Sequence, residues 1–171
     1  MGSMKINGME EFELALSRLA AGTDRVAQKA LREAAKPVAD RVRRNLENLQ
    51  EDFMLDPSAP YHYLPDGSHY TGVPAQQKAD LLEALGVTNV RVNNRGDWDI
   101  KIGFDGSGYD SQRTRTYPRG RPLLMLARSI EHGSSIQPKQ PFFRKAVEAT
   151  KKQAVEIMNR IITEETEKVV K

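Results

Sequence analysis

One long row of apolar side chains limits the folds open to this chain. Between residues 27 and 49 these side chains recur at steps of three or four, which is the spacing of one face of an α-helix. The row consists of Ala27, Leu31, Ala34, Val38, Val42, Leu46 and Leu49. Thr23 suits the N-cap of such a helix, and Pro37 predicts a kink inside it because proline lacks a backbone N–H. The sequence therefore predicts one long amphipathic helix over 23–49.

Further segments have the same helical spacing. Residues 9–19 predict a short helical opening, which Gly22 is expected to end before the long helix begins. Two short helices are expected over 78–85, ended by Gly86, and after Pro122, ended by Gly133. A second long helix is expected to open at Pro141. The buried faces predicted for these last two helices are Leu123, Leu126, Ala127 and Ile130, and then Phe143, Val147, Thr150, Ala154, Met158 and Ile161.

Alternation of apolar and polar residues indicates a strand. Trp98, Ile100, Ile102 and Phe104 alternate with Asp97, Asp99, Lys101 and Gly103. This period of two is typical of a strand with one face on the core and one in water. Val90 and Val92 precede the turn residues 93–96, so a hairpin is expected. Since two strands alone are marginal, a third is expected from 4–7 or 109–117. The predicted fold class is α+β, with a small antiparallel β-sheet packed against two long helices, plus two short helices.

Length and composition suit a single domain. The chain has 171 residues, of which 39% are hydrophobic and 29% charged. We place the domain at 4–171, because Met1–Ser3 resemble residues left by an expression vector, with long loops at 53–76 and 105–121. The absence of cysteine excludes disulfides and thiolate metal sites. The longest apolar run, 123–127, is far shorter than the ~20 residues that span a bilayer.

The positive charge of the chain is concentrated in two segments. Residues 18–44 hold eight basic side chains against three acidic ones, although the net charge of the whole chain is only +3. Residues 111–121 hold no acid and four arginines, which are Arg113, Arg115, Arg119 and Arg121. This loop could face DNA phosphates, with Tyr117 as a stacking group. A solvated loop is the interpretation favoured over sequence-specific binding, since no known docking element presents the arginines. Non-specific attraction to DNA stays open.

No combination of residues predicts catalysis. His62, Asp66 and His69 share one loop, but metal ligands normally lie on rigid elements with a second shell, so solvent-facing histidines are the simpler interpretation. Glu131 and His132 are adjacent, and neighbours on a helix diverge by about 100°, so they do not form an acid–base pair. There is also no cysteine nucleophile and no Gly-x-Ser-x-Gly turn. We predict no catalytic residue, cofactor or metal, and an enzyme is the least favoured alternative.

One segment resembles a family of phage proteins. Residues 127–135, Ala-Arg-Ser-Ile-Glu-His-Gly-Ser-Ser, are similar to the signature of siphophage tail-completion proteins, which are neck or minor tail components of lambda-like phages and prophages. In that family a Pro-Phe segment and a C-terminal helix follow, and here Pro141 and Phe142 occupy that place. Residues 6–12 resemble the family's opening. The chain departs from the family at 53–74, where a tyrosine- and proline-rich insertion replaces the usual Pro-x-x-Thr-Gly-x-Leu segment.

The resemblance implies a structural virion protein and no enzyme. It implies a ring, often a hexamer, that joins head to tail between the capsid connector and the tail, with Glu131, Gly133, Pro141 and Phe142 as structural residues. Its partners would be copies of itself, other neck and tail-tube proteins and, non-specifically, packaged DNA, with no membrane and no cofactor. The protein would be made in the bacterial cytoplasm and would reside in the virion. The alternative function is a small basic nucleic-acid-binding module.

One surface prediction rests on residue type alone. Tyr61, Tyr63 and Tyr70 lie in the insertion. Because tyrosine is enriched in the centre of protein interfaces, we expect these side chains to contact a neighbouring subunit or the tail tube.

Overall fold

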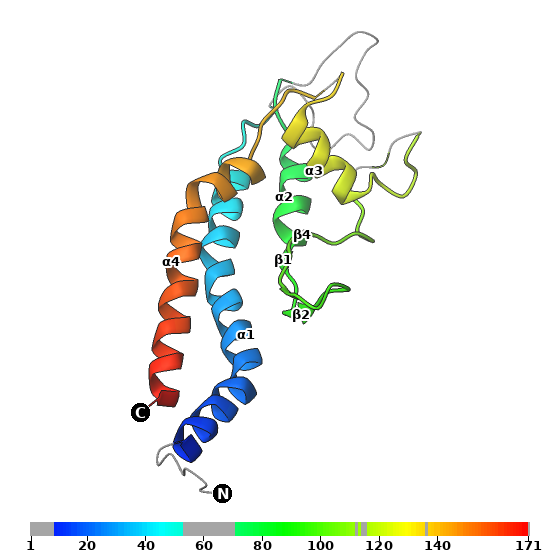
Figure 1. Cartoon of the computed structure of the whole chain (residues 1–171). Helices are drawn as coiled ribbons and strands as arrows, with labels where there is room; N and C mark the ends of the chain where they lie inside the picture. Colours follow the sequence, from blue (N-terminus) through cyan, green and yellow to red (C-terminus); the bar gives the residue numbers. More distant parts are fainter. Residues whose placement is uncertain (1–8, 53–70, 112, 114–115, 136, 171) are drawn as a thin grey trace, which may run out of the picture.

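The computed structural model describes residues 9–52, 71–111, 113, 116–135 and 137–170, with the backbone alone for 9–21 and 169–170. Over these residues the fold is α+β, as predicted, with four helices and four short strands. In chain order they are α1 (Met9–Glu47), α2 (Ala75–Ala84), β1 (Leu85–Val87), β2 (Arg91–Val92), β3 (Trp98–Asp99), β4 (Ile102–Phe104), α3 (Leu123–His132) and α4 (Phe143–Val170). Figure 1 shows a long two-helix arm beside a smaller head.

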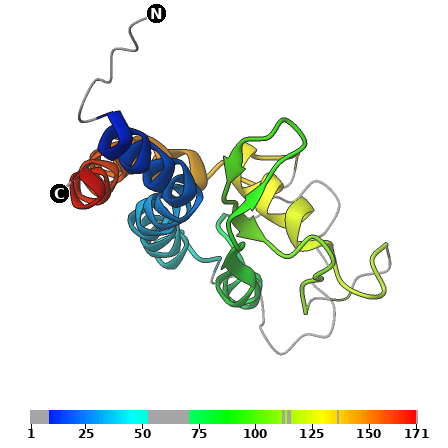
Figure 2. The same ribbon diagram turned by 60° about the horizontal axis from the view of Figure 1, so that its bottom comes forward.

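The arm consists of α1 and α4. The 39 residues of α1 extend about 58 Å at 1.5 Å per residue. α4 runs back along it, so the start of α1 and the end of α4 lie at the same end of the arm (Figures 1 and 2). Small residues let the two helices approach closely, since Ala30, Ala34 and Ala146 are all buried. The Lys29 ammonium joins the helices near their free end, 2.7 Å from the Glu165 carboxylate.

α1 is one continuous helix, so the expected break at Gly22 is wrong. Gly22 and Thr23 both lie inside it, and Thr23 is not an N-cap. A glycine costs a helix only about 1 kcal/mol relative to alanine, and pairing with α4 offsets that cost. Pro37 also lies inside α1, where its missing N–H leaves the Glu33 carbonyl without its usual donor. The clearest bend of α1 in Figure 1 lies in its blue N-terminal third, before Pro37.

The strands form one long hairpin with two ladders. β2 pairs with β3 around the turn at 93–96, and β1 pairs with β4, both antiparallel. Thr88 connects the ladders, because its N–H donates to the Lys101 carbonyl at 2.8 Å while its hydroxyl accepts from the Lys101 N–H at 3.0 Å. The predicted hairpin is confirmed. It begins earlier than expected, at Leu85, since Gly86 lies within β1.

The expected third strand is absent from the described part of the sheets. Each ladder has two strands there, and 109–117 contributes only an isolated bridge between Tyr109 and Pro122. Residues 4–7 lie outside the described residues. The hairpin is instead stabilised by the core, against which Ile102 and Phe104 pack.

The core lies where α2, α3, the hairpin and the head ends of α1 and α4 meet. Its largest fully buried side chains include Leu46, Leu81, Leu126, Ile130 and Phe142. The buried face predicted for α3 is confirmed at all four positions. No described helix has the length and apolar character needed to cross a bilayer.

The face predicted for α4 is wrong at its first turn. Val147 is 38% exposed, whereas Ala146 and Phe142 are buried. The buried row of α4 therefore begins one residue before Phe143, with the phenylalanine that precedes the helix.

Candidate interaction surfaces

The glutamate of the family-like segment caps the last helix. Glu131 lies near the end of α3, and its carboxylate faces the start of α4. Its Oε2 accepts the backbone N–H groups of Phe142 and Phe143 at 2.9 and 2.8 Å, and its Oε1 accepts that of Arg144 at 3.0 Å. The first N–H groups of a helix have no partner within the helix, and a negative charge suits that end. Glu131 thus fixes the direction in which α4 leaves the head.

The turn after Glu131 brings the segment that precedes α4 back against the end of α3. Gly133 has φ +80°, and a side chain there would lie 3.1 Å from Cβ of Lys139. Beside it, the Gln140 N–H donates to the Ile130 carbonyl at 2.8 Å. Pro141 follows, and the Phe142 ring then packs edge-on against Phe104 at 6.0 Å between centroids. We call residues 130–144 the α3–α4 joint. It contains all four residues for which the family resemblance implies a structural role.

A second joint holds the two flanks of 53–70 together. The Val73 N–H donates to the Gln50 carbonyl at 2.8 Å, and the Asp52 N–H donates to the Val73 carbonyl at 3.0 Å. The buried Gln137 side chain donates to the Gly72 carbonyl at 2.8 Å. Both flanks are therefore fixed on the head. Tyr61, Tyr63 and Tyr70 themselves lie outside the described residues, as do His62, Asp66 and His69.

The arginine loop is closed at its base by Asp110. This buried residue accepts the Arg121 N–H on Oδ1 at 2.6 Å, and its own N–H donates to the Arg121 carbonyl at 2.9 Å. Arg113 and Arg119 are exposed, Arg121 is half-buried, and Arg115 lies outside the described residues. The loop presents Arg113 and Arg119 to solvent from a fixed base.

Gly120 permits this closure, and we expect Gly120→Ala to lower the free energy of unfolding by about 2 kcal/mol. Its φ is +95°, and an added Cβ would lie 2.0 Å from the Asp110 carbonyl oxygen. Gly96 is a matched control, because its φ is +87° but an added Cβ meets nothing within 4 Å. Gly96→Ala then costs only the backbone strain, about 1 kcal/mol. Urea denaturation of both variants checks this, and equal losses would show that contact with Asp110 is unimportant.

A group of apolar side chains on the head is exposed to solvent. Val87, Leu124 and Met125 are 46%, 52% and 48% exposed. Val87 and Leu124 line one shallow cleft of about 440 Å³, together with Ile102 and Phe104. Met125 follows Leu124 in α3, lies outside the residues that line the cleft, and accepts a hydrogen bond from the Tyr117 hydroxyl at 3.5 Å on its Sδ. We call Val87, Leu124 and Met125 the apolar patch. Single exposed apolar residues are ordinary, but grouped ones at a cleft are typical of a contact surface.

The acids and histidine that the structure describes are engaged in local interactions or lie in water. Within the described ranges no three His, Cys, Asp or Glu side chains are grouped to hold a metal ion. His132 is exposed at the end of α3. Hydrogen bonds from the Ser107 backbone and hydroxyl lower the pKa of Asp105. Hydrogen bonds from Lys29 and then Lys168 lower the pKa of Glu165 to about 2. Both pKa shifts are explained by hydrogen bonds to neighbouring side chains or backbone at the protein surface.

One charged surface was missed at the level of sequence. Five basic residues of α1 fall on a single side of the helix, within a sector of about 60° at 3.6 residues per turn. They are Arg25, Lys29, Arg32, Lys36 and Arg43, and all five are exposed. We call them the basic face. Counting charges over 18–44 did not reveal it, whereas the helical period applied to charges would have done so.

Comparison of the chain with protein-family models finds no match, and comparisons with curated proteins and with solved structures find none either.

Proposed function

We propose that this chain is a structural head–tail joining protein that assembles into a ring in the neck of a phage or prophage particle. The observation that carries the proposal is the bonding of Glu131, whose two carboxylate oxygens accept three N–H groups at the start of α4. A signature glutamate used in this way has a mechanical role, to orient a helix. That role suits an assembly protein, because the function of such a protein depends on the shape of its subunits.

The head offers surfaces suited to neighbouring subunits. The apolar patch lies beside the β1–β4 ladder, and within the described ranges each of these two strands has one edge without a strand partner. Such edges and patches are common sites of protein–protein contact. If the patch of one subunit meets a different surface of the next, rotation closes the contacts into a ring. Tyr61, Tyr63 and Tyr70 are proposed to add contacts to a subunit or the tail tube.

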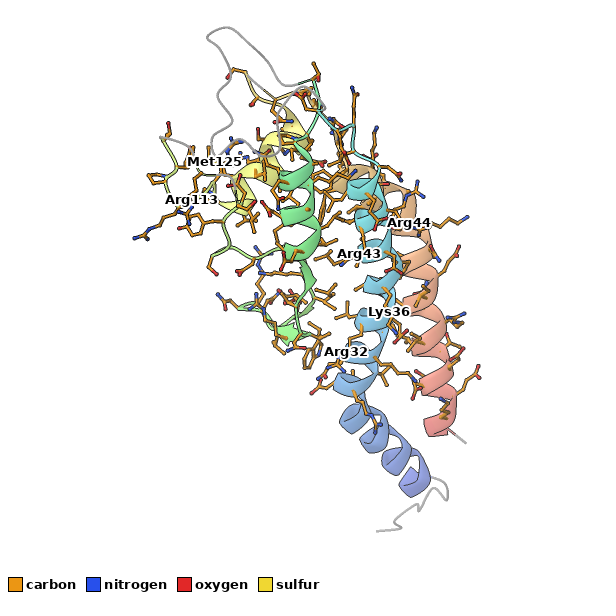
Figure 3. The ribbon with its side chains drawn as sticks, turned by 180° about the vertical axis from the view of Figure 1, so that it is seen from behind. Arg32, Lys36, Arg43, Arg44, Arg113 and Met125 are labelled. Atoms are coloured by element: carbon orange, nitrogen blue, oxygen red, sulfur yellow. The ribbon has the colours of Figure 1, made fainter. Side chains whose placement is uncertain are left out.

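The alternative function is a small nucleic-acid-binding module. The position of the arginine loop gives this alternative little support. Figures 2 and 3 place this loop, with the labelled Arg113, on the far side of the head from the arm that carries Arg32 and Lys36. The two basic segments therefore do not combine into one binding surface.

Complementation of a lysogen from which this gene is deleted tests the proposal. Without the gene, we expect electron microscopy to show filled heads and free tails that are not joined, and the wild-type gene to restore whole particles. Leu124→Ser with Met125→Ser should fail to restore them. Val147→Ser with Val155→Ser, which alters two similarly exposed apolar residues on α4, should succeed. Joined particles without the gene would overturn the proposal.

The tyrosines are best tested in the same assay by substitution with serine. Removal of 56–73 as a whole is not a suitable test, because Val73 is fully buried in the core. Such a deletion would damage the fold and would not isolate the tyrosines. Full restoration of particles by the Tyr61→Ser, Tyr63→Ser, Tyr70→Ser variant would refute their role.

A further inference from the structure

The basic face is a straight row of positive charge on the arm. From Arg25 to Arg43 it extends about 27 Å along α1 at 1.5 Å per residue. Figure 3 shows Arg32, Lys36 and Arg43 following one another along the helix. The buried residues lie on other sides of α1, with Ala34 about 180° and Val42 about 100° around the helix from the basic face. All five side chains are exposed, although Lys29 also contacts α4 and Arg43 also contacts α2.

Only part of this charge is neutralised in the described structure, where the Lys29 ammonium forms an ion pair with Glu165 of α4 at 2.7 Å. Arg25 and Arg32 have no hydrogen bond or ion pair with any described residue. Lys36 pairs only with Glu33 on its own helix and stays 63% exposed. Arg43 makes a long hydrogen bond of 3.5 Å to the Leu82 carbonyl. A typical solvated helix face alternates in sign along its length. Five exposed cations on one side of α1, flanked by the three acids Glu33, Asp40 and Glu47, still leave an excess of positive charge, which suits a partner with regularly repeated negative charge.

We propose that the basic face binds the phosphate backbone of duplex DNA without sequence preference. Duplex DNA presents one negative charge per ~1.7 Å of its axis, so 27 Å corresponds to about eight base pairs. Phosphate contacts of this kind position a protein without reading bases. That this DNA is the genome passing through the neck rests on the proposed function, whereas the binding itself does not.

A second copy of the chain fits the basic face less well. Among the described residues one acidic row has comparable spacing, formed by Glu33, Asp40 and Glu47 beside the basic face. It is shorter, and Glu33 is already paired with Lys36 at 2.6 Å. The acids of α4 are interspersed with lysines and arginines. A polyanion from outside the chain therefore complements the face better than the chain complements itself.

Fluorescence anisotropy with the full chain tests the proposal. The probe is a labelled mixed-sequence duplex of about 24 base pairs, titrated between about 50 and 200 mM NaCl. The test variant is Arg25→Gln, Arg32→Gln, Lys36→Gln, which spares Lys29 and Arg43 because they contact other elements. The control is Lys145→Gln, Lys151→Gln, Lys152→Gln, which removes the same charge from exposed positions of α4.

Each lost phosphate contact reduces the slope of log K against log salt by about 0.9. We expect the test variant to bind at least tenfold more weakly at the lower salt concentration and to lose about 2–3 units of slope. The control should keep the wild-type slope and lose less than about threefold in affinity. Circular dichroism verifies that both variants are folded.

Three results would overturn the proposal. One is wild-type protein that does not bind the duplex at low salt, and another is equal weakening in the test and control variants. The third is competition by poly-L-glutamate as strong as that by DNA at equal charge, which would indicate an acidic protein surface as the partner. The lysogen assay is independent of all three, because it reads the joining of heads to tails.

Discussion

Replacement of Phe142 by alanine is expected to lower the free energy of unfolding by about 4 kcal/mol, because it empties the space of a large core side chain. Phe142 is only 2% exposed. Its ring lies edge-on to Phe104 and to Phe143, with centroids 6.0 and 6.4 Å away. It connects the hairpin to the start of α4, so its loss also loosens the α3–α4 joint. Urea denaturation followed by circular dichroism measures the change.

The neighbouring Phe143 provides the control. It is only partly buried against the same core. Phe143→Ala should therefore cost about 1–2 kcal/mol, clearly less than Phe142→Ala. A larger loss for Phe143 would mean that the first turn of α4 packs with the opposite face inward.

Loss of the Glu131 carboxylate is expected to have the second largest effect. Glu131→Ala leaves three N–H groups at the start of α4 without their acceptor and removes a charge that suits the helix dipole, so we expect a loss of about 3 kcal/mol. Glu131→Gln keeps one acceptor oxygen of the same reach, so it should lose about half as much. Thermal and urea unfolding of the two variants give these values.

Glu156 is the matched control for this prediction. It lies exposed on α4 with no ion pair or hydrogen bond to a described residue. Glu156→Ala should change stability by less than about 0.5 kcal/mol. If Glu131→Ala were as mild as this control, the cap would not be what fixes α4, and the principal support for the proposed function would be lost.

Elements whose signal is local could be predicted from the sequence. The buried face of α3 follows from apolar spacing alone, since Leu123 and Ile130 lie on one side of any helix through them. The hairpin turn is also local. The Asn93 side chain accepts the N–H groups of Arg95 and Asp97 at 2.8 and 3.0 Å, and Gly96 takes φ +87°. Such signals need no distant partner.

Features that depend on distant packing were predicted wrongly. Gly22 looked like a helix end, but it lies opposite Ile162 and Thr166 of α4, and pairing with that helix outweighs the cost of glycine. The third strand was inferred because two strands are marginal alone, and no described residue supplies it, while residues 4–7 lie outside the described part of the chain. The packing of Ile102 and Phe104 on the core supplies the missing stability in another way.

Of the interaction surfaces, one depends on distant residues and could not be predicted, and the other follows from a local pattern and could have been. The sequence places Glu131 in a family-like segment, but its bonds reach residues 11–13 positions away and depend on the turn at Gly133. Spacing could not have predicted those partners. The basic face, in contrast, follows from the same helical period that revealed the apolar row of α1, applied to its cations.

The antiparallel course of α1 and α4 has a practical consequence for experiments on the intact chain. Met9 and Val170 lie at the far end of the arm, away from the apolar patch and both joints (Figure 1). A fluorophore or affinity handle attached at position 9 or 170 is thus remote from the head. Two dyes, one at position 9 and one at position 170, would be close neighbours in the native fold, so energy transfer between them would report directly on whether the arm is closed.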